Sequence, residues 1–324
     1  MGTPEFSAKI LSGLLDDGYN IIGVITEPDK PMGRKMEVQP TPVKSFALSV
    51  GLKVFQPEKK INVTEVIKDL NPDLVIVAAY GKIITKETLD IPKYGCINFH
   101  GSLLPELRGA SPIQSAILQG LDKTGVTIMK MDEEMDTGPI LTQVEIELDK
   151  KETTTTLRAK MLEHGLPLLL NTITGYIDGE IEPKEQVGKA TYTKMIKKED
   201  GKIDFGKNAE EEERKLRAFN EWPGVFGFWD SKRIKFIEVD SNFQFSIFQA
   251  SPDRAERDNF QSISNDQFSS MKPGEIFLGD NNLLCIKFKD GIWVVKKLQI
   301  EGGKAMSAKD FLNGNKDFVG SILS

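Results

Sequence analysis

The chain has 324 residues and a net charge of −6, with 39% hydrophobic and 28% charged residues. This composition is typical of globular proteins, and the length predicts two domains. No apolar run reaches the ~18–20 residues of a membrane span, and the start of the chain lacks the features of a signal peptide. The two cysteines lie far apart in the sequence. This disfavours a disulfide framework or a zinc site, so we expect a cytoplasmic protein without a metal.

The first half of the chain predicts alternating helices and strands. Thr3 is expected to cap a helix that starts at Pro4, and residues 20–26 to form a strand. The apolar run 74–79 indicates a strand buried on both faces. Further elements are expected in this order: a strand over 95–100, a helix from Ser111 to about Gly120, strands over 126–131 and 140–148, and a helix over 156–176. The order predicts an α/β fold with a doubly wound, mostly parallel, Rossmann-like sheet.

The second half has a different composition. Residues 179–202 are polar and lysine-rich, so we interpret them as a basic linker between a first domain, residues 1–178, and a second, residues 203–324. The second domain is expected to hold a helix over 210–219 and strands over 225–229, 234–239, 274–278, 283–288 and 292–298. Several short strands with one helix are typical of a small OB-like β-barrel. The polar stretch 240–271 is interpreted as a surface insertion.

Two polar residues, Asn98 and His100, end an otherwise apolar predicted strand. Alternate residues of a strand face the same side, so both can point into one crevice at the carboxyl end of the sheet, where such folds bind ligands. Asp136 follows in a polar loop. The three groups suit formyl transfer to an amine: the amide can donate to an oxyanion, the imidazole can move a proton, and the carboxylate can orient the imidazole. The alternative is structural: a hydrogen-bonded pair that closes the strand, and a capped turn before Gly138.

Several runs of residues resemble the folate-dependent formyltransferase family. They are Ile97–Pro105, Arg108–Ile113, Gly125–Met129 and Met135–Gly138. The resemblance implies that Asn98, His100 and Asp136 are catalytic, and that 10-formyltetrahydrofolate is the formyl donor. It also implies a set of folate contacts, namely Ser102, Leu103, Leu104 and Pro105.

Further runs, including Gly2–Phe6 and Arg217–Gly224, resemble the branch of the family that acts on methionyl-tRNA. This implies that the protein formylates the amino group of initiator methionyl-tRNA for translation initiation. We expect it to be a monomer. The basic loop with Arg34 and Lys35 is then expected to hold tRNA together with the second domain, because arginine suits phosphate. The alternative is a surface loop with incidental charge. In this branch an apolar strand directly precedes the segment that corresponds to Gly2–Phe6. This sequence lacks that strand, so we expect the native protein to begin upstream of Met1.

Two other functions remain open. An amino-sugar nucleotide N-formyltransferase would use the same donor and the same three polar residues. A non-enzymatic RNA-binding protein with a retired catalytic domain is disfavoured, because Asn98, His100 and Asp136 are all present. The negative net charge gives no global support for nucleic-acid binding, so any tRNA contact must be made by local basic patches.

Overall fold

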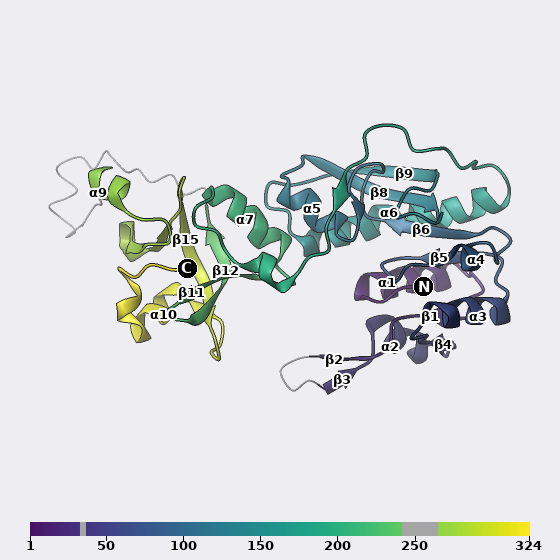
Figure 1. Ribbon diagram of the computed structural model, residues 1–324, viewed down its shortest axis with the longest axis horizontal. Helices are drawn as coiled ribbons and strands as arrows, with labels where there is room; N and C mark the ends of the chain where they lie inside the picture. Colours follow the sequence, from purple (N-terminus) through teal and green to yellow (C-terminus); the bar gives the residue numbers. More distant parts are fainter. Residues whose placement is uncertain (33–36, 242–264) are drawn as a thin grey trace. The chain divides into compact units, whose positions relative to one another are not determined.

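The computed structural model describes residues 1–32, 37–241 and 265–324, which fall into two compact units (Figure 1). The first unit runs from Met1 to Ala116 and from Leu121 to Met195. The second comprises Ile117–Gly120 and the chain from Ile196 onward. Much of the stretch that we interpreted as a linker therefore belongs to the first unit.

Helices and strands alternate along residues 1–195, as the sequence pattern predicts. The helices are α1 (Glu5–Asp16), α2 (Pro42–Ser49), α3 (Lys60–Leu70), α4 (Lys86–Leu89), α5 (Pro112–Leu118) and α6 (Thr154–Ile177). The strands are β1 (Val24–Ile25), β2 (Lys30–Met32), β3 (Glu37–Gln39), β4 (Val54–Phe55), β5 (Val75–Val77), β6 (Cys96–His100), β7 (Arg108–Gly109), β8 (Lys123–Lys130), β9 (Ile140–Glu147) and β10 (Tyr192–Thr193).

Short polar side chains start two of these helices. The Thr41 hydroxyl accepts a hydrogen bond from the backbone N–H of Lys44 at the start of α2, and Thr153 forms a capping box with Thr156 at the start of α6. The predicted Thr3 cap is wrong. Helix α1 begins at Glu5 without a side-chain cap, and the Thr3 hydroxyl instead donates to the Tyr80 carbonyl at 3.1 Å. Thr3 thus ties the start of the chain to the segment that follows β5.

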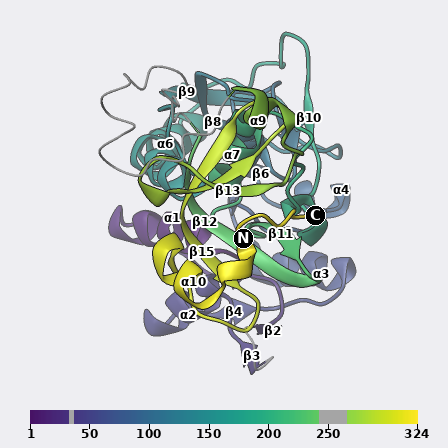
Figure 2. The same ribbon diagram turned by 90° about the vertical axis from the view of Figure 1, so that its left-hand side faces the viewer.

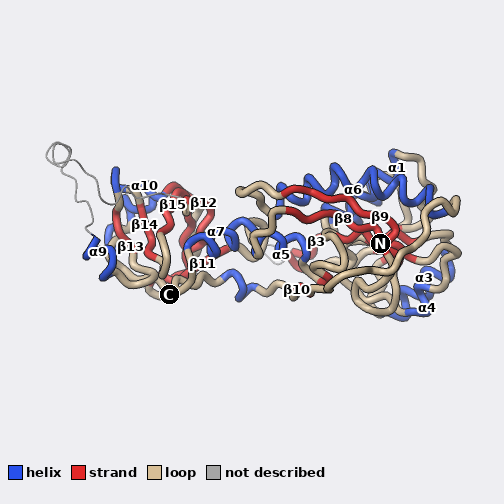
Figure 3. Tube along the Cα trace, turned by 90° about the horizontal axis from the view of Figure 1, so that it is seen from above, coloured by secondary structure: helices blue, strands red, loops and turns tan. Residues whose placement is uncertain are grey.

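The sheet around the candidate site has parallel and antiparallel parts. Strand β5 pairs with β6 in parallel, whereas β6 with β8 and β8 with β9 are antiparallel. Helix α6 runs alongside β8 and β9 and packs on them (Figure 3), and α1 packs on α2 and α6. Ile97 of β6 and Ile128 of β8 are fully buried in the sheet. The parallel strands with helices packed around them agree with the predicted Rossmann-like fold, to which β8 and β9 add an antiparallel edge.

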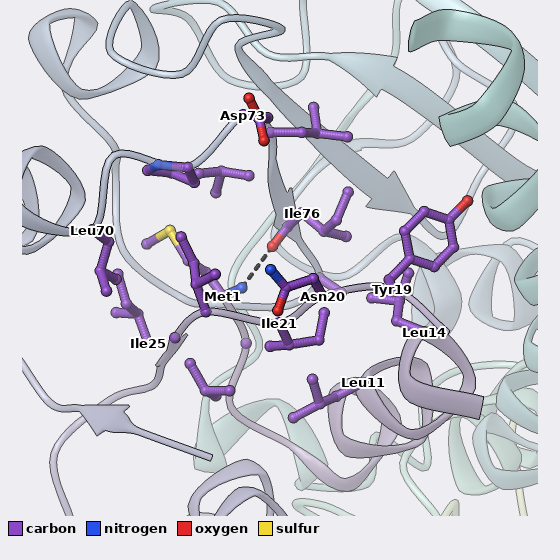
Figure 4. A pocket seen from close by; sticks show the side chains of 18 of the residues that line it. Met1, Leu11, Leu14, Tyr19, Asn20, Ile21, Ile25, Leu70, Asp73 and Ile76 are labelled. Carbon is purple, nitrogen blue, oxygen red and sulfur yellow. Dashed lines mark hydrogen bonds between the residues drawn. The ribbon is translucent and has the colours of Figure 1, made fainter. Parts of the chain in front are cut away.

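Met1 and Gly2 lie between β1 and β5. Gly2 bridges Ala78 in parallel and donates its N–H to the Ile25 carbonyl at 3.0 Å. The Met1 ammonium donates to the Ile76 carbonyl at 2.6 Å (Figure 4), and burial lowers its pKa to about 6. A cavity of about 510 Å³ extends from Met1; much of its lining is apolar and includes Leu11, Leu14, Ile21 and Leu70. The expected upstream start stays a prediction.

The second unit is built on one antiparallel sheet. Its strands are β11 (Val225–Trp229), β12 (Lys232–Asp240), β13 (Ile276–Leu278), β14 (Leu284–Lys287), β15 (Ile292–Ile300) and β16 (Met306–Ser307), and its helices are α7 (Ala209–Ala218), α9 (Asn265–Ser270) and α10 (Ala308–Gly314). The strand order is β11-β12-β15-β14-β13, with β16 beside β15. Figure 2 shows this unit from the front, with β11, β12, β13 and β15 labelled. The Trp293 ring packs edge-on against Phe236 with centroids 5.6 Å apart, in the core of this unit.

The predicted OB-like barrel is a curled, half-barrel sheet. Among the described strands, β11 and β13 stand at opposite ends of the order and do not pair with each other. Most of the predicted polar insertion, residues 242–264, lies outside the described residues. In the described chain, no helix is long and apolar enough to cross a membrane, and no group of His, Cys, Asp and Glu side chains is placed to hold a metal ion.

Candidate functional site

Strand β6 carries Asn98 and His100 on one face at its carboxyl end. It lies between β5 and β8, where Asn98 is opposite Val77 and Met129. His100 is buried and Asn98 is half-buried. Among the described residues, none hydrogen-bonds the Asn98 side-chain amide. The two side chains are therefore not a mutually bonded pair that closes the strand, and the amide is available to a ligand.

The His100 ring lies between two hydrogen-bond acceptors. Its Nε2 is 3.2 Å from the Leu107 carbonyl, and its Nδ1 is 3.6 Å from Oδ1 of Asp136. The second distance is too long for a hydrogen bond and leaves an electrostatic contact. Burial lowers the pKa of His100, while the Asp136 charge and the Leu107 carbonyl act in the opposite direction. The ring is thus mainly neutral near pH 7, and Asp136 and the Leu107 carbonyl are the two groups that favour its protonated form.

Asp136 reaches this ring from the loop between β8 and β9. Its backbone is in the left-handed region, with φ of 57°, which aspartate adopts more readily than most residues. Its Oδ2 accepts a hydrogen bond from the Gly109 N–H at 2.7 Å. The turn itself is bonded by another carboxylate, since Asp132 accepts the Thr137 hydroxyl at 2.7 Å. The alternative role that the sequence allowed for Asp136, capping the turn before Gly138, is therefore filled by Asp132. Asp136 instead faces the imidazole of His100.

The predicted folate contacts form a loop fixed by β8 and β9. The Ser102 hydroxyl donates to the Glu106 carbonyl at 2.5 Å, and the Thr127 hydroxyl donates to the Ser102 carbonyl at 2.6 Å. Ser102 and Leu104 are buried, whereas Leu103 and Pro105 are partly exposed. The first pair therefore holds the loop, and the second pair can present side chains to a ligand. The folate role of these residues stays a prediction.

Residues 184–194, which the sequence predicts as part of a linker, pack on the chain that follows this loop. Residues 184–194 bond to it through Thr191, whose hydroxyl accepts the Leu107 N–H at 2.8 Å, and through the parallel pair β7–β10. Gly109 has φ of 107°, and a Cβ there would lie 2.7 Å from the Thr193 carbonyl, so only glycine fits. The polar, lysine-rich composition of this segment is that of a linker, so no local signal indicates these contacts.

The remaining candidate residues lie elsewhere. Arg34 and Lys35 fall outside the described residues, so their tRNA role stays a prediction. The large cavity beside Met1 is separate from the candidate site, because neither Asn98, His100 nor Asp136 lines it.

Comparison with known proteins decides the family. The sequence family described as Formyl transferase matches residues 1–173, and that described as Formyl transferase, C-terminal domain, matches residues 195–316. The chain belongs to the formyl transferase family. It is therefore an enzyme, with the Rossmann-like first domain and the antiparallel second domain expected for this family.

Relatives of this formyl transferase match over their full length. Methionyl-tRNA formyltransferase of Bacillus cytotoxicus is 49% identical over 327 residues, which cover 100% of this chain and 97% of that protein. The protein of the same name from Caldicellulosiruptor saccharolyticus is 42% identical over 328 residues, covering 100% and 98%. The crystal structure of WlaRD, a sugar 3N-formyl transferase with dTDP and 5-N-formyl-THF, has a TM-score of 0.60 at 20% identity and covers 94% of this chain and 97% of that one. The last likeness concerns the fold alone.

Proposed function

We propose that this formyl transferase moves the formyl group of 10-formyltetrahydrofolate to the α-amino group of initiator methionyl-tRNA, for the initiation of translation. The observation that carries the proposal is the full-length identity of 49% to a protein named methionyl-tRNA formyltransferase, with both domains matched. Asn98, His100 and Asp136, hereafter the polar trio, supply the groups that this transfer needs.

The reaction exchanges one bond for another at the formyl carbon. The amine nitrogen forms a bond to this carbon, the bond to the folate nitrogen breaks, and a proton passes from the first nitrogen to the second. The formyl oxygen carries negative charge in between. Asn98 has a half-buried amide without a partner among the described residues, and it donates a hydrogen bond to this oxygen. No covalent enzyme intermediate is needed, because the substrate amine is the nucleophile.

His100 takes the proton from the attacking amine and gives it to the folate nitrogen when the bond between that nitrogen and the formyl carbon breaks. Since burial lowers its pKa, the ring is available as a base near neutral pH. When Nε2 donates its proton to the Leu107 carbonyl, the lone pair of Nδ1 is free on the side of Asp136. Asp136 then stabilises the imidazolium that forms, because its carboxylate stays fixed by the Gly109 N–H.

The substrates are proposed to occupy different parts of the chain. The loop from Ser102 to Pro105, with Leu103 and Pro105 partly exposed, holds the folate beside β6. Because the net charge is −6, tRNA phosphates need local cations, and we assign this role to Arg34, Lys35 and the second domain. The enzyme is proposed to act in the cytoplasm, where translation takes place. Its monomeric state stays a prediction.

The test is a comparison of acceptors. We expect kcat/KM for methionyl-tRNA to exceed that for every member of a panel of amino-sugar nucleotides with the same donor. The panel is the natural competitor, because a protein of similar fold is named a sugar formyl transferase. Transfer to a sugar nucleotide but not to methionyl-tRNA would establish the alternative enzyme. Binding of tRNA without any transfer would indicate the non-enzymatic RNA-binding protein.

A further inference from the structure

The side chain of Gln186 is hydrogen-bonded at both ends. Its oxygen accepts from Nε and Nη2 of Arg108 at 3.1 and 2.7 Å. Its nitrogen donates to the carbonyls of Asp136 and Gly138 at 2.9 and 2.8 Å. Both amide protons and both oxygen lone pairs of the side chain are thus used. Gln186 joins the loop that carries Asp136 to the strand that carries Arg108.

The turn at Asp136 needs such a support. A non-glycine residue in the left-handed region persists only where its surroundings fix it. The orientation of the flanking peptides decides where the Asp136 carboxylate points, and Gln186 binds the carbonyls on both sides of Thr137. With this backbone held, Oδ2 meets the Gly109 N–H at 2.7 Å and Oδ1 lies 3.6 Å from Nδ1 of His100.

The other end of this link is firmly anchored. The Arg108 guanidinium donates to the Tyr192 hydroxyl at 3.2 Å and lies over the same ring, 5.9 Å from its centroid. The backbone around Arg108 is paired with β10, and its N–H donates to the Thr191 carbonyl at 2.9 Å. The carbonyls of the Asp136 turn are therefore tied to a braced strand.

We propose that Gln186 is a positioning residue for formyl transfer, which holds the Asp136 carboxylate against His100 and Gly109. The proposal rests on the proposed function, since it assumes that the polar trio carries out the reaction. Gln186 acts through Asp136, because its side-chain atoms bond to Arg108, Asp136 and Gly138. The segment 184–194 is thereby part of the catalytic unit.

Loss of the link has a consequence at His100. Without Gln186 the turn can relax towards an ordinary backbone conformation, and the Asp136 carboxylate moves away from the ring. Of the groups acting on His100, Asp136 is the charged one, and it raises the pKa that burial lowers. Its withdrawal must therefore lower the pKa of His100 further.

The experiment is an NMR titration of the imidazole signals. The chain has two histidines, His100 and the exposed His164, so the second serves as an internal reference. In Gln186→Met, which keeps the length of the side chain but not its hydrogen bonds, His100 is expected to titrate at a lower pH than in the unaltered protein. Turnover should fall by about tenfold to a hundredfold, as for other small misplacements of catalytic groups.

The matched control is Gln299→Met in the second unit. This glutamine is also half-buried and donates to a backbone carbonyl, that of Gly303 at 2.8 Å. The Gln299→Met variant should leave the titration of His100 unchanged. If Gln186→Met does not fold, Gln186→Asn replaces it, since the shorter side chain cannot span both loops and should shift His100 in the same direction.

The outcomes separate the two proposals. An unchanged His100 titration in a folded Gln186 variant overturns the positioning role, whatever happens to turnover. An equal shift in Gln299→Met also overturns it, because the effect would then be general. The His100 titration could be shifted in the Gln186 variant while the unaltered protein transfers no formyl group. This result would support the link to Asp136 and reject the proposed function.

Discussion

Thr127 holds the loop that we expect to bind folate. It is fully buried in β8, and its hydroxyl donates to the Ser102 carbonyl at 2.6 Å. The same oxygen accepts from the Leu104 N–H at 3.1 Å and from the Gln143 amide at 2.8 Å. Thr127→Val preserves the shape of the side chain and removes all three bonds. The variant therefore tests whether this hydroxyl fixes the loop.

The structure sets the expected size of the effect. The Leu104 N–H and the Ser102 carbonyl would be left buried without their partner, at a cost of about 1–3 kcal/mol for each. Gln143 is exposed and keeps its bond to the Leu104 carbonyl, so it adds little. We expect the free energy of unfolding of the first unit to fall by about 2–6 kcal/mol, the sum of these two costs.

A neighbouring threonine provides the control. The Thr142 hydroxyl meets that of Thr172 at 2.5 Å, and Thr172 keeps its own bond to the Leu168 carbonyl at 2.6 Å. Thr142→Val should therefore cost less than about 1 kcal/mol. Urea unfolding of both variants gives the comparison, and the KM for the folate donor should rise only in Thr127→Val. Equal stabilities of the two variants would refute the role of the Thr127 hydroxyl.

Three further predictions concern the site, the tRNA and the amino end of the chain. Asn98→Ala, His100→Ala and Asp136→Ala should each lower turnover by about 10²–10³-fold with an almost unchanged melting temperature; near-normal turnover in all three would contradict the mechanism. Arg34→Ala should weaken tRNA binding and flatten the slope of log affinity against log salt by about one unit, and equal slopes would remove the tRNA role of this loop. In protein whose intact mass retains Met1, the free energy of unfolding should rise between pH 6 and pH 8, because burial lowers the pKa of the ammonium from 8.0 to about 6 and the unfolded chain holds the extra proton in this range. The rise due to this group should reach at most about 3 kcal/mol, so the total rise should be smaller after Nα-acetylation; an equal rise in both forms would contradict it.

The elements that carry the site could be predicted because their signals are local. The apolar run around β5 has no polar face, and the two-residue period of β6 places Asn98 and His100 on the same side. The predicted strand over residues 20–26 is reduced to Val24–Ile25. Its first residues line the cavity beside Met1, where no described strand lies next to them.

The contacts that complete the site depend on distant segments. The two-residue strands β7 and β10 are too short to leave a pattern in the sequence, and they form only because they pair with each other. The bonds of Gln186 and the role of the Leu107 carbonyl follow from this pairing. A closed barrel and a half-barrel differ in whether the end strands β11 and β13 pair with each other. The residue pattern within a single strand does not determine this pairing.

A single-turnover measurement tests directly whether the polar trio of this enzyme formylates methionyl-tRNA. Labelled 10-formyltetrahydrofolate and methionyl-tRNA are mixed with an excess of the unaltered enzyme or of His100→Ala. The label is expected on the methionyl α-amino group with the unaltered enzyme, and about 10²–10³-fold more slowly with the folded variant. Absence of label from methionyl-tRNA with the unaltered enzyme, or equal rates for the two proteins, would contradict it.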